Sequence, residues 1–417
     1  MRNLHRRWIK SAVAVAAITG AAVLTACSSG ASSSAVSSSP AQSPASSASS
    51  AAPAASASGA STAASATPTL LSLSPAQALA AAYKGTFGAP PATGPAAVSG
   101  KSVWVVSCGQ AAYSCSIPAG YAMQAVSKIG WTGHLCDGKL DPTTESTCVQ
   151  QATAAGANAI LLAGIDCSGL VGQLQTAKAA GLLIIDPLGF DCNDPHVGGN
   201  PVFSGNSTYA GGETLQAYMT DWGASRAAWI IGASHGTAQV IDVTLDGVLT
   251  PTYADAGFQQ MMVKCSGCKV VDTVHLTLAD LGSGAAQQKV ATALQSNPSA
   301  TYLDSPFDSA IPAFIAGSVK DSGRKNLQIM GDECFPLNLG YVGTGGPESA
   351  CSALVEAWDE WAAVDDLNRL FSGESAAQLP DSGNGFQLVD KTHNLGPANS
   401  YNPPVNFEAD YEKVWGK

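Results

Sequence analysis

Residues 151–162 read Gln-Ala-Thr-Ala-Ala-Gly-Ala-Asn-Ala-Ile-Leu-Leu, and this stretch decides the fold. Its first half ends a helical segment that we expect over Thr144–Ala155, and its second half begins a strand expected over Ala159–Ala163. The strand is a short apolar run, which is typical of a strand buried in a parallel sheet. A helix followed at once by such a strand is the repeating unit of an α/β fold.

The same alternation continues along the chain in two series, and each series predicts a parallel sheet with crossover helices. The first has strands expected over Ser102–Ser107, Thr132–Leu135, Ala159–Ala163 and Leu182–Ile185, with helices over Ala119–Lys128, Thr144–Ala155 and Leu170–Ala180. The second has strands over Ala228–Ile231, Val270–Leu276, Thr301–Leu303 and Leu327–Met330, with helices over Tyr209–Trp222, Tyr253–Val263, Leu281–Gln295 and Ile311–Val319. A strand, a helix and a strand follow, over Ala353–Val355, Glu360–Phe371 and Phe386–Val389.

The N-terminus has the features of an export signal. Four basic residues precede an uncharged run over 11–23, which ends in Leu-Thr-Ala-Cys at 24–27. This string resembles the bacterial lipobox, whose cysteine receives a diacylglyceryl group and becomes the mature N-terminus. We therefore expect residues 1–26 to be a signal peptide and Cys27 to be acylated, anchoring the chain to the outer face of the cell membrane. A soluble secreted protein with a coincidental cysteine is the alternative.

The next segment has the composition of a tether. Residues 28–68 are almost wholly Ser, Ala, Pro, Thr and Gly and carry no charge, so we expect a disordered tether over 27–94. The remaining roughly 320 residues exceed the usual size of a domain with a single hydrophobic core, so two domains are expected. Beyond residue 26, 16 basic residues stand against 31 acidic ones, a net charge of about −15. No basic patch for nucleic acid is expected.

Ten cysteines remain after Cys27, and an exported chain reaches a compartment where disulfides persist. They lie as near neighbours, and we expect five local disulfides: Cys108 with Cys115, Cys136 with Cys148, Cys167 with Cys192, Cys265 with Cys268, and Cys334 with Cys351. The sequence alone does not prove this connectivity. A strand rather than a helix follows the Cys-x-x-Cys string, which favours a structural disulfide over a redox motif. No cysteine or histidine set has zinc spacing, so no metal is expected.

Polar residues follow most of the expected strands. Ligands of open parallel sheets bind beyond the carboxyl ends of the strands, so these residues are candidate ligand contacts. They are Ser107, Gln110, Asp166, Asp186, Asp191, Asn206, Asp304 and Glu333. Each has an ordinary alternative as a helix cap or turn former. We also expect two or three of the aromatic residues Tyr113, Phe190, Phe307 and Trp358 to face the ligand site, where a ring can stack on an apolar face of the ligand.

Several strings carry a resemblance that covers roughly residue 100 to the C-terminus. They are Lys101–Ser107, Gln151–Leu162, Asn206–Gly212, Leu303–Asp308 and Glu360–Glu374. In their order and spacing they resemble the type I periplasmic binding proteins, the group that includes ribose-binding protein. The resemblance implies two doubly wound parallel-sheet lobes joined by three hinge crossings. It also implies a monomeric, non-enzymatic solute-binding protein without a cofactor, whose partners are a small ligand, a sugar or polyol above all, and the permease of an ABC importer.

The resemblance places the hinge crossings near Val202–Asn206, Cys351–Glu356 and Gly383–Phe386. The N-terminal lobe would comprise 95–205 with 356–385, and the C-terminal lobe and tail 206–355 with 386–417. Ligand contacts would fall at Asn206, at Asp308 (or Asp304 if the strand is shorter), and at Glu356 with Trp358 beside it. Asp308 has the alternative of capping the next helix.

The arginines bear on the charge of the ligand. Only Arg226, Arg324 and Arg369 follow the signal segment, and we expect them in two loops before strands and in a helix. None is expected at the carboxyl end of a strand, which argues against an anionic ligand. A neutral polyol is expected, with a cationic amine left open.

One string supports a competing function. Gly232-Ala-Ser-His-Gly236 fits the nucleophile elbow of α/β-hydrolases, with Asp304 and His393 later in the chain. A hydrolase using Ser234 is therefore one alternative, and a receptor that signals through a partner is another. In the solute-binding interpretation, His235 is a candidate ligand contact at the mouth of the second lobe.

Overall fold

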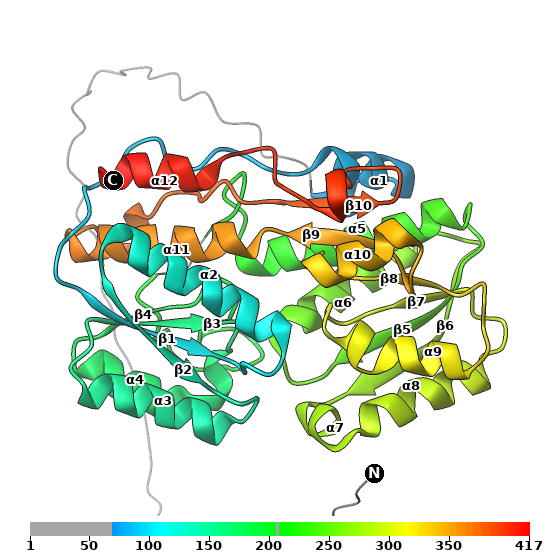
Figure 1. Ribbon diagram of the computed structural model, residues 1–417, viewed down its shortest axis with the longest axis horizontal. Coiled ribbons are helices and arrows are strands. Elements are labelled where there is room, and N and C mark those ends of the chain that lie inside the picture. The colour runs from blue at the N-terminus through cyan, green and yellow to red at the C-terminus, as the bar shows by residue number, and fades with distance from the viewer. Residues whose placement is uncertain (1–68, 206–207) are drawn as a thin grey trace, which may run out of the picture. The chain divides into compact units, whose positions relative to one another are not determined.

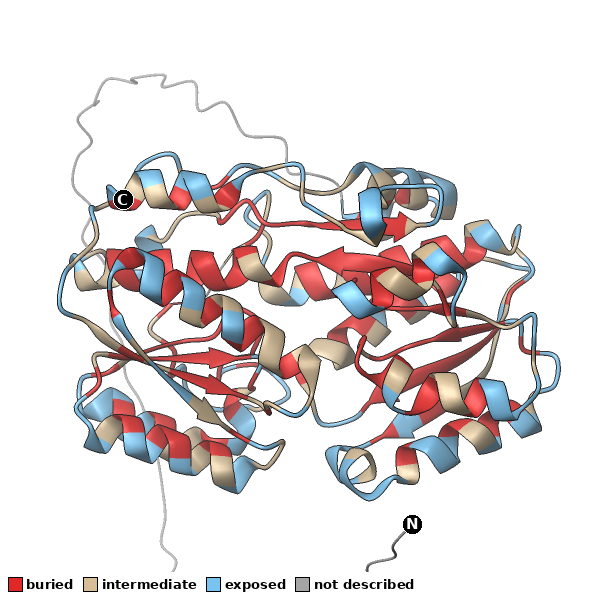
Figure 2. Ribbon diagram, viewed as in Figure 1, coloured by how far each residue is buried: buried red, intermediate tan, exposed pale blue. Residues whose placement is uncertain are grey.

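The computed structural model describes residues 69–205 and 208–417, so the expected signal peptide, Cys27 and Asn206 lie outside the described residues. In the first lobe, a parallel sheet has the order β2 (Thr132–Asp137), β1 (Ser102–Ser107), β3 (Ala159–Ala163), β4 (Leu183–Ile185). Helices α2 (Tyr113–Ile129) and α11 (Glu356–Phe371) pack on one face, and α3 (Pro142–Ala154) and α4 (Val171–Ala179) on the other (Figure 1). Strands β1, β3 and β4 are largely buried between these helical layers, whereas the edge strand β2 is partly exposed (Figure 2). This is a doubly wound α/β lobe.

The second lobe has the order β10 (Phe386–Asp390), β9 (Glu348–Leu354), β8 (Gln328–Met330), β7 (Tyr302–Asp304), β5 (Gln239–Leu245), β6 (Lys269–Leu276). All pairs are parallel except β9 with β10. One core packs the sheet against α5 (Leu215–Ala233) and α6 (Leu249–Met262). The opposite core uses α8 (Ala285–Ser296) and α9 (Ala316–Asp321). Two shorter helices are α7 (Leu278–Ser283) and α10 (Pro336–Thr344).

The expected strand at Ala228–Ile231 is wrong, because these residues form the last turns of α5. Nearly the whole of α5 from Tyr218 onward is buried, so its sequence has no polar face. A short apolar run in such a helix cannot be told from a buried strand by its pattern. A Cβ on Gly223 would lie 1.8 Å from the carbonyl oxygen of Ala254, so this glycine lets α5 approach α6 closely. The missing strand is β5, directly after the helix.

Two further segments join the lobes. Helix α11 begins two residues after β9 leaves the second sheet, and it packs against α2 of the first lobe. The chain then returns to the second sheet as β10, which gives two crossings within the described residues where they were expected. The final helix α12 (Phe407–Trp415) packs on α11, so the tail expected with the second lobe ends in the core of the first. The first expected crossing includes residues 206–207, which are not described.

The expectation of a tether as far as residue 94 is wrong for its last part. A 3₁₀ turn, Leu70–Ser72, and helix α1 (Pro75–Lys84) pack against α5. Ser74 caps α1 in a capping box with Gln77, and Pro75 occupies the first helical position. The string Ser-Pro-Ala-Gln is therefore a helix start that could have been read from the sequence. Further on, Gly88 donates to the carbonyl oxygen of Gly383, beside the third crossing.

The structure contains the five local disulfides that were expected from the sequence. They join Cys108 to Cys115, Cys136 to Cys148, Cys167 to Cys192, Cys265 to Cys268 and Cys334 to Cys351. Within the described part of the chain, none of the helices is both long enough and apolar enough to cross a bilayer.

Candidate ligand-binding site

The two lobes touch directly through the loops that leave their strands. The Tyr113 hydroxyl of α2 lies 2.7 Å from the carbonyl oxygen of Asp308 and 2.8 Å from the amide oxygen of Asn338. The Thr250 hydroxyl donates to the carbonyl oxygen of Leu188 at 2.7 Å. These bonds join the first lobe directly to the second.

Asp166 forms a further bond between the lobes. It follows β3, and its Oδ2 accepts the backbone N–H of Leu249 at 2.7 Å, while its Oδ1 accepts that of Phe190 at 2.9 Å. Leu249 is the first residue of α6, which has no side-chain cap of its own, so a carboxylate of one lobe caps a helix of the other. Burial raises the pKa of Asp166 to about 6, and the two amide bonds partly oppose this rise.

A cavity of about 250 Å³ lies between the lobes. It is bordered by residues just beyond the carboxyl ends of β1, β3, β5, β7 and β8, as expected for ligand sites of open parallel sheets. Most of its wall is apolar, including Leu140, Ile165, Leu188, Leu245, Val248, Leu281 and Leu354. Two aromatic residues, Trp222 of α5 and Phe307 after β7, also line it.

The polar part of the wall is dominated by four carboxyl groups. Glu145 of α3 and Asp166 come from the first lobe, Glu333 follows β8, and Glu356 is the first residue of α11. Burial raises the pKa of Glu145 to about 7, and Asp141 and Asp166 add to the rise. Burial and the Asp308 carboxylate raise the pKa of Glu333 to about 8. Burial and then Glu333 raise the pKa of Glu356 well above its usual value. Asp166 thus acts on Glu145, and Glu333 acts on Glu356.

Of the residues proposed from the sequence, Asp166, Glu333, Glu356 and Phe307 line this cavity. Ser107, Gln110 and Tyr113 lie nearby, at or just after the end of β1, but are not part of its wall. The Ser107 hydroxyl donates to the carbonyl oxygen of Cys115 and accepts the N–H of Gly109. The Gln110 side-chain nitrogen is buried without a partner among the described residues. Tyr113 instead makes the bond between the lobes described above.

Asp304 and Asp308 are buried, and their side chains bind residues of the second lobe. The Asp308 carboxylate accepts the N–H groups of Asp332 and Phe335, both at 2.8 Å, and so fixes the loop after β8. Asp304 forms an ion pair with Arg226 at 3.2 Å. Burial raises the pKa of each aspartate to about 7. Neither side chain belongs to the cavity wall.

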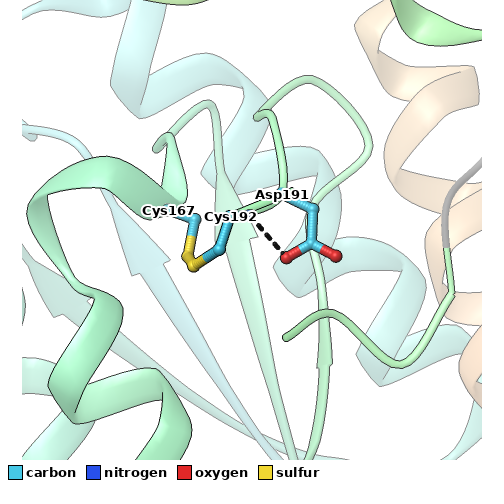
Figure 3. A group of neighbouring side chains, drawn as sticks. All are labelled: Cys167, Asp191 and Cys192. Carbon is cyan, nitrogen blue, oxygen red and sulfur yellow. Dashed lines mark hydrogen bonds between the residues drawn. A yellow bond between two sulfur atoms is a disulfide. The ribbon is translucent and has the colours of Figure 1, made fainter. Parts of the chain in front are cut away.

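Asp186 and Asp191 organise the loop after β4. Asp186 accepts N–H groups of Ile165, Leu188 and Gly189, at 2.7–2.9 Å. Figure 3 shows Asp191 beside the Cys167–Cys192 disulfide; its Oδ1 accepts the N–H groups of Cys192, Val202 and Phe203. Three potential metal ligands lie together here, but the two sulfur atoms are bonded to each other. Phe190, in the same loop, packs on Tyr253 with 4.7 Å between ring centroids.

Two sequence-based placements are corrected. His235 was expected after a strand, but it lies after α5 and before β5, at the amino end of that strand and outside the cavity wall. Trp358 is fully buried in α11, where its ring stacks with Phe87 and Phe407 and its indole N–H donates to the carbonyl oxygen of Ser382. It is a core residue.

The hydrolase motif also lacks its required context. Ser234 follows a helix instead of a strand, and its hydroxyl donates to the carbonyl oxygen of Ile231. His393 lies elsewhere, stacked on Tyr83 and paired with Asp390. A nucleophile elbow needs a strand-to-helix turn, whereas this string joins a helix to a strand. Ser234 is a helix-end residue.

The expected position of Arg226 is wrong as well. It lies in α5, and its guanidinium reaches the carboxyl ends of β7 and β8, where it pairs with Asp304 and Asp332 and donates to the carbonyl oxygen of Ser305 at 2.9 Å. It also lies over the Trp222 ring at 4.9 Å. Arg226 thus lies behind Trp222 and outside the cavity wall. Its positive charge is paired with the buried carboxylates of Asp304 and Asp332.

Sequence reasoning missed several wall residues, namely Ser114, Glu145, Ser168, Trp222, Thr250 and Ser309. Glu145 reads as an ordinary acidic residue of a first helical turn, after the cap Asp141. Trp222 was placed in a helix, but its direction depends on how α5 packs. No local signal distinguishes these residues from surface or core positions.

The residues 118–375 match the family model of the periplasmic binding protein domain, which covers more than half of the chain. The chain belongs to this family. It is a family of extracytoplasmic solute-binding proteins and not of enzymes, in agreement with the five disulfides. The sequence matches none of the curated proteins.

Solved structures share the fold at low identity. An ABC transporter solute-binding protein of Agrobacterium vitis with bound α-D-tagatopyranose is 18% identical, with a TM-score of 0.61, and the match covers 73% of this chain and 100% of that one. One of Burkholderia graminis in complex with D-arabinose is 18% identical, with a TM-score of 0.58 and coverage of 72% and 98%. A second Agrobacterium vitis protein, with bound allitol, is 17% identical, with a TM-score of 0.55 and coverage of 70% and 95%.

Proposed function

We propose that this chain is the solute-binding lipoprotein of an ABC importer and that it binds a sugar or polyol between its lobes. The observation that carries the proposal is the cavity between the lobes at the carboxyl ends of both sheets. Its volume of about 250 Å³ suits a small molecule, and its wall combines apolar surface and aromatic rings with a few oxygen acceptors. The solved structures with similar folds contain bound arabinose, tagatose and allitol, which supports this class.

The proposed ligand contacts are the wall residues Asp166, Glu333, Glu356, Trp222 and Phe307. Hydroxyl groups of a polyol can donate to the carboxylates, and the rings can cover its C–H face. Asn206, outside the described residues, stays a proposed contact. Because Asp166 also bonds to Leu249 of the other lobe, it links the occupied cavity to lobe closure.

We predict that a thermal-shift screen of pentoses, hexoses, polyols and their amine derivatives will contain binders. At a ligand concentration about 100 times its dissociation constant, the folded state gains about 2.7 kcal/mol, provided that the unfolded chain does not bind. That gain corresponds to a melting shift of several degrees. Trp222 lies in the wall, so binding is also expected to change tryptophan fluorescence.

The matched variants for this screen are Glu333→Gln, in the wall, and Glu374→Gln, outside it. The first is expected to lose most of the ligand-induced shift, whereas the second keeps it. A panel without any binder would contradict the proposed function, and equal shifts in the two variants would move the site elsewhere.

We further propose that Cys27 carries the lipid anchor and that the ligand is passed to a membrane permease. Mass spectrometry of the protein from its own membrane is expected to find an acylated N-terminal Cys27, and Cys27→Ser is expected to abolish both processing and membrane association. An unmodified N-terminus at another residue would remove the anchor but leave ligand binding untouched. If cells that lack this chain still took up the ligand, a signalling receptor would be favoured instead.

A further inference from the structure

Among the described residues, the cavity wall has acidic but no basic side chains. Among the described residues, its polar side chains are four carboxyl groups and the hydroxyl groups of Ser114, Ser168, Thr250 and Ser309. It contains no lysine, arginine, histidine, asparagine or glutamine from the described part of the chain. The indole N–H of Trp222 is already donated to the carbonyl oxygen of Ser352 at 2.7 Å. In their ionised form the carboxyl groups make the wall rich in acceptors and poor in side-chain donors, and a ligand rich in donors matches that form.

Glu356 is the wall residue with an unused hydrogen-bond acceptor among the described residues. Its side chain is in the wall although the residue is only 5% exposed, and its Oε2 has no hydrogen-bond partner among the described residues. A buried carboxylate oxygen without a partner is costly, and native structures seldom keep one without a reason. The open acceptor therefore indicates where a ligand donor sits.

The main electrostatic influences on Glu356 from the described residues include no cation. The charges that bear on it are those of Glu333, Asp308, Asp359 and Glu360, which are all acidic. Arg226 acts on Glu333 and Asp308, but its own charge is paired with Asp304 and Asp332. Carboxylates brought together in this way disfavour each other's ionised forms. A positive charge on the ligand would relieve that repulsion, whereas a neutral ligand would leave it.

We propose that the ligand is a protonated amine on a hydroxylated carbon frame, an amino sugar or amino polyol, whose ammonium group binds Glu356 and Glu333. This rests on the proposed function and selects between the two ligand classes that the sequence leaves open. An ammonium group has three donors and no acceptor, which suits a wall of carboxylates. Bonds between two charged partners are about twice as strong as neutral ones. Trp222 and Phe307 can hold the cation or the C–H face beside it.

Matched compounds test the charge alone. Glucosamine, glucose and N-acetylglucosamine, and the corresponding galactose set, share a frame and differ at one position as ammonium, hydroxyl or neutral amide; 1-amino-1-deoxysorbitol with sorbitol extends the test to polyols. Isothermal titration with the purified full-length protein at pH 7 is expected to show at least tenfold tighter binding for at least one amine than for its neutral partners.

Two variants on one helix supply the matched control. Glu356→Gln removes the open carboxylate and is expected to weaken amine binding at least tenfold, with little effect on any neutral sugar. Glu360→Gln lies one turn later on α11, is also buried and is outside the wall. Its carboxyl group acts on Glu356 only through its charge, so this variant should change the affinity much less than Glu356→Gln does.

Neutral sugars or polyols that bind at least as tightly as their amines would overturn this proposal and leave the proposed function intact. So would amine binding that survives Glu356→Gln. If no compound of the panel binds, the proposed function fails together with this inference.

Discussion

Replacing Arg226 with Met is expected to lower the free energy of unfolding by about 3–5 kcal/mol at pH 7.5, because the change leaves buried carboxylates without their cation. The Arg226 residue is 3% exposed and pairs with Asp304 and Asp332 at the ends of two central strands. Asp242 on the neighbouring β5 also depends on it, because the guanidinium opposes the rise in the pKa of that carboxyl. Chemical denaturation at pH 7.5 measures the loss.

The matched control is Arg324→Met. Arg324 donates to the backbone carbonyl oxygens of Leu294, Asn297 and Ala300 but forms no ion pair within the described residues. Its loss removes hydrogen bonds without stranding a charge, so a smaller cost of about 1–3 kcal/mol is expected. The penalty of Arg226→Met should also shrink at pH 5, where the aspartates can take up protons. Equal costs for both variants at both pH values would contradict the role of Arg226 as the counter-charge.

The position of Arg226 is also a feature that the sequence alone did not predict. The strands β1 and β3 have the bounds that were predicted, because each is a short apolar run between polar or glycine-containing loops. Helix α5 was cut in two by the prediction, since a helix buried on all sides lacks the polar face that reveals its period. Once part of α5 was assigned to a strand, Arg226 moved to a loop. Its position at the carboxyl ends of β7 and β8 then could not be inferred.

The same limit applies to the site. The rule that ligands bind beyond the carboxyl ends of parallel strands pointed to the edge of both sheets at which the cavity lies. It could not separate Asp166 and Glu333, which face the cavity, from Asp191 and Asp308, which bind backbone amides of their own loops. Both groups of acidic residues follow a strand and lie in a loop. The difference lies in the tertiary direction of each side chain, which has no local signature in the sequence.

The second large effect is expected from pH. Burial raises the pKa of Asp186 and Glu333 to about 8 and that of Asp359 to about 7, and it raises the pKa of Glu360 well above its usual value. In the unfolded chain such groups titrate near pH 4. Between these values the folded state binds more protons than the unfolded state, so the free energy of unfolding falls as the pH rises. Asp390 has its pKa lowered to about 2 and adds stability that is lost only below about pH 4.

We therefore expect the unliganded protein to be most stable near pH 5 and to melt several degrees lower at pH 8. Glu360→Gln tests one source of this fall. Glu360 is fully buried in α11, both its oxygens lack hydrogen-bond partners among the described residues, and the titratable groups that act on it or are acted on by it are Asp186, Asp359, Glu356 and Tyr209. The amide has nearly the same shape and no charge, so it should raise the melting temperature at pH 8 by about 2 °C or more. At pH 5, where the carboxyl is already neutral, it should change little.

Calorimetry of both proteins from pH 5 to 8 measures the difference, with Glu408→Gln on the partly exposed α12 as the control that should follow the unchanged protein. A gain for Glu360→Gln that is the same at pH 5 and pH 8 would mean that the amide acts through packing. The unchanged protein could instead become less stable from pH 8 towards pH 5. That result would show that the buried carboxyl groups are ionised in the folded state, which would contradict their raised pKa values.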